Sequence, residues 1–111
     1  MTYTSLVIIV ETPIFTRLIG KLLADEEYRR LQITLLLRPE QGALIPGTHG
    51  LRKIRWKKRD RRKRGGLRFI YFWDLSNERL YMIYGYEKTQ QADLTPSQIK
   101  TLGRIVREEL K

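Results

Sequence analysis

The side chains best suited to chemistry in this chain are concentrated in one basic segment. Eleven lysines and arginines lie between Arg52 and Arg68, together with a single acid, Asp60. Eleven positive charges minus one leave +10, which equals the net charge of the whole 111-residue chain. The remainder of the sequence is therefore electrically balanced. A charge excess confined to one segment predicts a binding site for a polyanion, and nucleic acid is the first candidate.

Cutting RNA without a metal ion needs three functions, and the usual proton carriers are scarce here. The 2′-hydroxyl must lose a proton, the phosphorane must be stabilised, and the 5′-oxygen must gain a proton. The one histidine, His49, stands in a glycine-containing loop, where we expect it to be solvated. The chain has no cysteine, and its carboxylates show neither an acidic pair nor metal-ligand spacing. We therefore expect no metal and no cofactor, and the basic residues remain as the candidates.

Hydrophobic periodicity and helix-start signals predict seven elements in the order βααβββα, which is an α+β domain. Thr12-Pro13 and Thr95-Pro96 each place a capping residue before a proline, a favourable helix start. We predict strands over residues 3–10, 51–56, 67–74 and 79–86, and helices over residues 13–22, 25–38 and 95–110. The first two helices form a hairpin that covers one face of an antiparallel-rich sheet.

The length of the chain indicates a single domain over residues 1–111. No apolar run approaches the roughly 20 residues that a membrane-spanning helix needs. We therefore expect a cytoplasmic protein with no membrane partner. Residues 39–50, rich in proline and glycine, are predicted to form a loop. Residues 57–66 are predicted to form a solvated basic loop between two strands.

Strand periodicity decides which of the basic residues share a face. Side chains alternate along a strand, so Lys53 and Arg55 lie on one face and Ile54 and Trp56 on the other. Whether Arg68 joins Lys53 and Arg55 depends on the strand register, which the sequence leaves open.

The element order and four segments resemble the RelE superfamily of toxins, and most closely its HigB-like branch. The segments are ETPIFTR at 11–17, IPGTHGLRKIRW at 45–56, GGLRFIYFW at 65–73 and YEKTQQADLTPSQ at 86–98. The resemblance implies a RelE-like fold and the toxin of a type II toxin–antitoxin system. Such a toxin binds the translating 70S ribosome and cuts mRNA by attack of the 2′-hydroxyl, without a metal. It also implies a HigA-like helix-turn-helix antitoxin as partner.

Family position selects four basic residues as catalytic candidates: Lys53, Arg55, Arg68 and Lys88. A guanidinium does not deprotonate in a protein, so Arg55 and Arg68 are expected to bind the phosphate and stabilise its charge. Lys53, flanked by positive charges that favour a neutral amine, is the hypothesis for the general base. Lys88 is the candidate acid for the leaving group.

A second set of residues is predicted to bind RNA without taking part in the chemistry. The basic loop is expected to dock on ribosomal RNA through phosphate contacts that weaken with salt. Two aromatic residues close to the basic residues are candidates for stacking on mRNA bases. The set comprises Trp56, Lys57, Lys58, Arg59, Arg61, Arg62, Lys63, Arg64 and Tyr86.

Three other interpretations remain open at this point. A ParE-like gyrase poison uses the same scaffold without the catalytic basic residues. A non-catalytic RNA- or ribosome-binding module would share the charge but would cut nothing. The basic residues could also form a solvated sheet edge that discourages aggregation.

Overall fold

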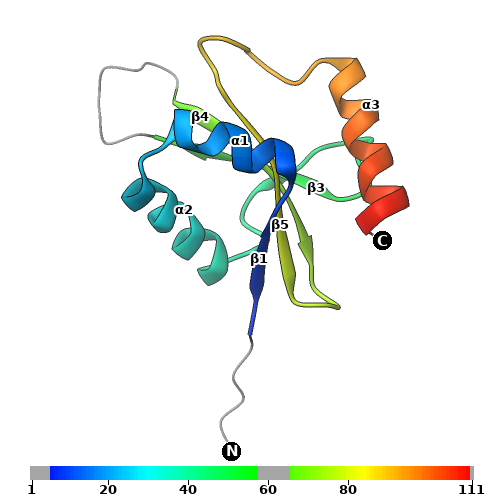
Figure 1. The fold of residues 1–111 in the computed structure, drawn as a ribbon. Coiled ribbons are helices and arrows are strands. Elements are labelled where there is room, and N and C mark those ends of the chain that lie inside the picture. Colours follow the sequence, from blue (N-terminus) through cyan, green and yellow to red (C-terminus); the bar gives the residue numbers. More distant parts are fainter. Residues whose placement is uncertain (1–5, 58–65, 111) are drawn as a thin grey trace, which may run out of the picture.

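The computed structural model describes residues 6–57 and 66–110. This part of the chain contains one five-stranded sheet, which Figure 1 shows at the centre of the fold. The strand order is β1-β5-β4-β3-β2. The strands are β1 (Ile8–Glu11), β2 (Ala43–Leu44), β3 (Leu51–Trp56), β4 (Leu67–Asp74) and β5 (Arg79–Glu87). β1 runs parallel to β5, and the other neighbours are antiparallel. The predicted α+β class is confirmed, with an antiparallel-rich sheet at its centre.

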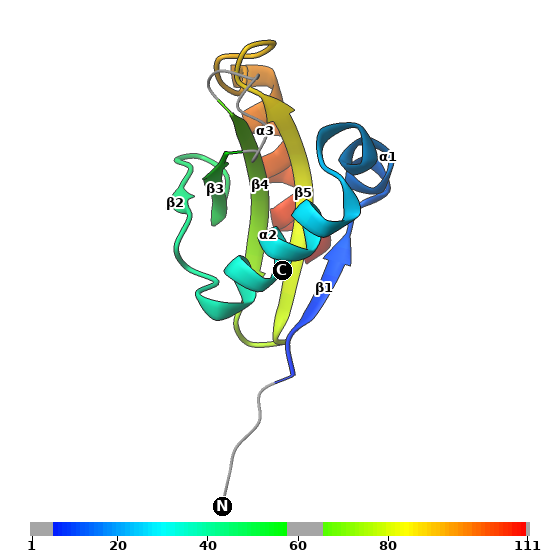
Figure 2. The same ribbon diagram turned by 90° about the vertical axis from the view of Figure 1, so that its left-hand side faces the viewer.

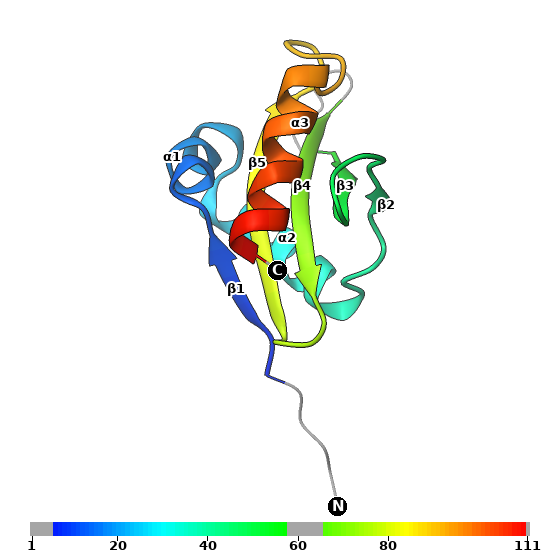
Figure 3. The same ribbon diagram turned by 90° about the vertical axis from the view of Figure 1, so that its right-hand side faces the viewer.

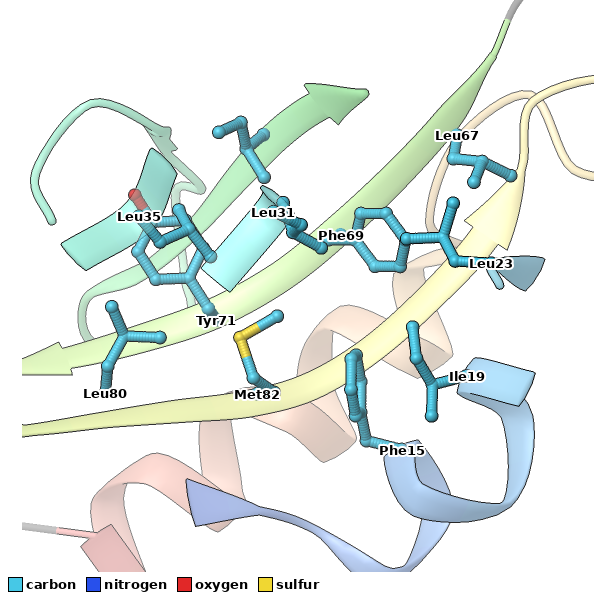
Figure 4. Packing of buried hydrophobic residues seen from close by; sticks show 11 residues of the cluster. Phe15, Ile19, Leu23, Leu31, Leu35, Leu67, Phe69, Tyr71, Leu80 and Met82 are labelled. Carbon is cyan, nitrogen blue, oxygen red and sulfur yellow. The ribbon is translucent and has the colours of Figure 1, made fainter. Parts of the chain in front are cut away.

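Helices α1 (Pro13–Leu22) and α2 (Asp25–Leu37) cover one face of this sheet. The hydroxyl of Thr12 accepts a hydrogen bond from the Phe15 N–H at 3.1 Å, so the predicted cap starts α1. Figure 4 shows side chains of both helices meeting those of β4 and β5 in a packed core. Its fully buried members include Phe15, Leu31, Leu35, Leu67, Phe69, Tyr71, Leu80 and Met82.

Helix α3 (Pro96–Ile105), which continues as a π-helical turn over Val106–Leu110, lies on the opposite face. Figure 2 shows α2 in front of the sheet and α3 behind it, and Figure 3 shows the reverse side with α3 in front. A capping box between Thr95 and Gln98 starts the helix as the sequence predicts. Val106 packs into a second core with Leu51 and Ile70. The sheet is therefore covered by helices on both faces.

The loop predicted over residues 39–50 contains a strand that the sequence analysis did not foresee. The two residues of β2 extend the sheet beyond β3, with Ala43 opposite Lys53. Side chains from the sheet anchor the segment before it. The Tyr71 hydroxyl donates to the Pro39 carbonyl at 2.6 Å and accepts from the Gly42 N–H at 2.9 Å. Arg52 donates to the Gly42 carbonyl at 2.8 Å. These contacts are long-range, which explains why local sequence signals did not predict the strand.

The first strand is shorter and less buried than its apolar sequence suggests. We expected a well-buried strand over residues 3–10, whereas β1 spans Ile8–Glu11 and residues 1–5 lie outside the description. β1 is an edge strand with β5 as its one neighbour, and Ile8 is 48% exposed. A continuous apolar run predicts a strand that is buried on both faces of the sheet, so the burial expected for the first strand is wrong.

Within the described residues, no helix has the length and apolar character needed to cross a bilayer.

Candidate active site

Two of the candidate arginines face each other across adjacent strands. Arg55 of β3 pairs with Arg68 of β4, and Arg68 pairs in turn with Tyr86 of β5. Arg68 alternates with Ile70 and Phe72, which pack in the α3-side core, so this row lies on the α3 face. Arg68 is only 7% exposed, whereas Arg55 is exposed. The register that the sequence left open therefore places both guanidinium groups on one face.

Lys53 lies on the same face, two residues before Arg55 along β3. We call Lys53, Arg55 and Arg68 the basic row. Like charges directly opposite each other destabilise a sheet. Placing Arg55 opposite Arg68 is thus unfavourable unless negative charge lies nearby. The basic row thus places two arginines and a lysine on one face of two neighbouring strands, a set of side chains that suits an anion.

Asp93, which was not among the residues selected from the sequence, brings negative charge to the basic row. Lys53 Nζ lies 3.3 Å from Asp93 Oδ1 and donates a hydrogen bond to it. The Leu94 N–H donates to the same oxygen at 2.8 Å. The Leu94 N–H and the Lys53 ammonium hold the pKa of Asp93 below its usual range, and the positive charge of Arg68 adds to this effect. Asp93 precedes the helix cap Thr95 in an Asp-Leu-Thr-Pro run, which was the available sequence signal.

Tyr86 is buried beside these charges, and the residue is 5% exposed. Its hydroxyl is also buried, and it has no hydrogen-bond partner among the described residues. Burial raises the pKa of Tyr86, the negative Asp93 raises it further, and the positive Arg68 opposes the shift. A covered ring offers no open face to a base, so the arrangement does not support the predicted stacking role. Tyr86 thus places a protonated hydroxyl, without a hydrogen-bond partner in the described part of the chain, next to the basic row.

Replacing Tyr86 with phenylalanine is expected to stabilise the fold by about 1 kcal/mol, because it removes a buried, unpaired hydroxyl. Urea unfolding measures this change. The matched control is Tyr84→Phe on the same strand, whose hydroxyl lies 3.5 Å from Gln91 Oε1 and should contribute little. A loss of stability in Tyr86→Phe would show that the hydroxyl has a partner. Higher stability together with slower activity would assign the hydroxyl to function.

Trp56 lies on the other side of the sheet from the basic row. Its indole N–H donates to Glu27 Oε2 of α2 at 3.3 Å, and its ring packs against the α1–α2 core. The alternation that places Lys53 and Arg55 on the α3 face sends Trp56 to the opposite face. The structure therefore separates Trp56 from the residues with which we expected it to bind RNA.

The remaining candidates lie at the edge of the site or outside the described residues. Lys88 is exposed just beyond β5, and its N–H donates to the Gly66 carbonyl at 3.2 Å, which brings its backbone to the same end of the sheet. No contact joins its side chain to the basic row among the described residues. Lys57 is exposed after β3. The rest of the predicted docking loop lies outside the description: Lys58, Arg59, Arg61, Arg62, Lys63 and Arg64.

His49 is placed away from the basic row, as the expectation of a solvated loop residue implies. It is exposed before the start of β3, whereas Arg55 lies near the end of that strand. It lines a cavity of about 560 Å³ with Asp74, at the end of β4, and Asn77, in the β4–β5 turn. In the described part of the chain, no three His, Cys, Asp or Glu side chains cluster as metal ligands do.

The fold has a known counterpart among solved structures. It is similar to that of the E. coli toxin RelE, determined in the free state as a doubly substituted mutant. The TM-score is 0.52 with 14% sequence identity, over 78% of this chain and 87% of the RelE chain. No protein-family model matches the sequence. At this identity the similarity establishes the fold, so this chain is a basic α+β domain with a RelE-like fold.

Proposed function

We propose that this protein is the toxin of a type II toxin–antitoxin system and cuts mRNA on the ribosome. The observation that carries the proposal is the basic row, in which Arg55 faces Arg68 and Lys53 lies on the same face. A RelE-like fold supports it, because E. coli RelE, whose fold is similar, is a toxin. The finer assignment to the HigB-like branch rests on the sequence segments described above.

In the proposed reaction the basic row binds the scissile phosphate. The 2′-oxygen attacks phosphorus, the bond from phosphorus to the 5′-oxygen breaks, and a 2′,3′-cyclic phosphate forms. Arg55 and Arg68 stabilise the extra negative charge of the phosphorane through paired N–H donors. Lys88 supplies the proton for the 5′-oxygen. No metal or cofactor takes part in this scheme.

The ribosome supplies the positioning that the small site lacks. Trp56 lies on the other face of the sheet and Tyr86 is buried, so neither aromatic candidate is open beside the basic row. Holding the 2′-hydroxyl in line with the breaking bond accounts for much of such a rate enhancement. We propose that the basic loop docks on ribosomal RNA and that the decoding site orients the mRNA. A cytoplasmic location follows from this partner, and a HigA-like antitoxin would neutralise the toxin.

The function is tested by mapping mRNA ends after adding the protein to a purified translation system. Primer extension is expected to show new 5′ ends within codons when ribosomes are translating, and none with mRNA alone. A non-catalytic RNA-binding module would bind ribosomes and leave the mRNA intact. A ParE-like gyrase poison would instead produce breaks in supercoiled DNA in the presence of gyrase. Either of these outcomes contradicts the proposal.

A further inference from the structure

The proposed cleavage needs a group that accepts the proton of the 2′-hydroxyl, and the basic row does not offer one. Arg55 and Arg68 stay protonated in a protein. Lys53 donates a hydrogen bond to Asp93, and an ammonium in that role has no free electron pair to accept a proton. His49 lies toward the other end of β3. A carboxylate beside the row could accept this proton without first losing one of its own.

Asp93 is a carboxylate in direct contact with the basic row, through Lys53. Glu87 is buried and pairs with Leu67, whose side chain lies in the α1–α2 core on the other face. Glu27 of α2 binds Trp56 and Arg30 on that same face. Asp93 instead lies in the loop between β5 and α3, which runs along the top of Figure 3. It meets Lys53 at 3.3 Å.

The two oxygens of the Asp93 carboxylate have different surroundings. Oδ1 accepts both hydrogen bonds, from Lys53 Nζ and from the Leu94 N–H, which together fix the orientation of the group. Oδ2 accepts no hydrogen bond from the described residues, and the side chain is 69% exposed. A carboxylate held by one oxygen, with the other open to solvent beside an anion site, has the arrangement of a general base.

We propose that Asp93 is the catalytic base, which takes the proton of the 2′-hydroxyl on Oδ2 while Lys53 and the two arginines hold the phosphate. This inference rests on the proposed function. As the proton moves to Oδ2, the 2′-oxygen forms its bond to phosphorus, and the 5′-oxygen leaves with a proton from Lys88. Water later returns both groups to their starting protonation. Lys53 thus orients Asp93 and neutralises charge instead of acting as the base.

The test is Asp93→Asn, which replaces the basic oxygen Oδ2 with an amide and keeps Oδ1 as an acceptor for Lys53 and Leu94. Single-turnover cleavage of ribosome-bound mRNA is expected to slow 100-fold to 10,000-fold, which is the range for loss of a general base. Ribosome affinity and thermal unfolding should stay close to those of the wild type, because the ion pair is exposed. Glu40→Gln, which changes an exposed acid before β2, is the matched control and should cut normally.

The pH dependence gives a readout that a structural role would not change. The Leu94 N–H, together with Lys53 of β3 and Arg68 of β4, lowers the pKa of Asp93 below the usual carboxylate range. The proposed base is therefore ionised throughout the neutral pH range. The Tyr86 hydroxyl of β5, with its raised pKa, stays neutral. The wild-type rate should therefore stay nearly flat from pH 6 to 8. A lysine base, with an ordinary pKa of about 10.4, would make the rate rise about tenfold per pH unit.

The outcomes separate the two proposals. Wild-type cutting that Asp93→Asn leaves unchanged, or accelerates, overturns the assignment of Asp93 and leaves the nuclease function standing. Acceleration would show that the carboxylate competes with RNA phosphate for the basic row. If the wild-type protein makes no cuts on translating ribosomes, the proposed function fails and the assignment of a base fails with it. A slow Asp93→Asn variant with unchanged ribosome binding supports both.

Discussion

Replacing Arg68 with alanine is expected to lower the single-turnover rate of mRNA cleavage about a thousandfold, comparable to the removal of an oxyanion-stabilising donor. Arg68 is the buried member of the basic row, at 7% exposure. Its partners across the sheet are Arg55 and Tyr86, which places it in the middle of the site. A guanidinium can bind two oxygens of one phosphate through its planar fork, which would stabilise the charge that develops on the phosphorane.

This experiment needs a control that separates an effect on cleavage from an effect on folding. Arg68 Nη1 donates to the Leu67 carbonyl at 3.0 Å, and removing a buried charged group also affects stability. Arg68→Lys keeps the charge and most of the volume but loses the planar fork, so it should fold and cut about 10-fold to 100-fold more slowly. Arg29→Ala, on the exposed side of α2 across the sheet, removes the same charge and should leave cleavage unchanged. If a folded Arg68→Lys variant cuts at the wild-type rate, then cleavage does not depend on a two-point contact between the guanidinium and the phosphate.

The largest expected effect on stability comes from one oxygen atom, the hydroxyl of Tyr71. Tyr71→Phe is expected to lower the free energy of unfolding by about 2–3 kcal/mol, because it leaves two backbone groups, the Pro39 carbonyl and the Gly42 N–H, without their hydrogen-bond partner. The hydroxyl donates to the Pro39 carbonyl at 2.6 Å and accepts from the buried Gly42 N–H at 2.9 Å. Gly42 leaves no space for adjustment, since a Cβ there would lie 2.8 Å from the Tyr71 hydroxyl. The melting temperature should fall by on the order of 10 °C.

Urea unfolding of Tyr71→Phe and Tyr81→Phe separates this effect from a general loss of hydroxyl groups. Tyr81 is half-buried on β5, and its hydroxyl forms no hydrogen bond with the described residues. Its replacement should change stability by less than about 0.5 kcal/mol. If Tyr71→Phe is equally mild, then the segment before β2 does not depend on the sheet for its hydrogen bonds. The strand that follows this segment, β2, pairs with Lys53 through Ala43, so loss of the segment's anchoring should also slow cleavage.

Local patterns in the sequence predicted the elements well where neighbouring residues decide the outcome. Thr12 and Thr95 cap α1 and α3 as expected, because a cap depends on residues within one turn. Alternation along β3 placed Lys53 and Arg55 together and Ile54 apart from them, which the packing confirms. By contrast, the apolar composition of the first strand did not reveal that β1 lies at an edge, since the strand order of a sheet is not a local property.

By itself the sequence determined the α+β class, most element boundaries and the concentration of positive charge in one hairpin. Only the tertiary structure decided that Arg55 lies opposite Arg68, that Tyr86 is buried, and that Asp93 meets Lys53. The physical reason is separation along the chain. Asp93 and Lys53 are 40 positions apart, and they meet because strand register and the packing of α3 bring their segments together. Charge and periodicity can be read from residues that are adjacent in the sequence. A site assembled from three strands and a loop forms only when the chain has folded.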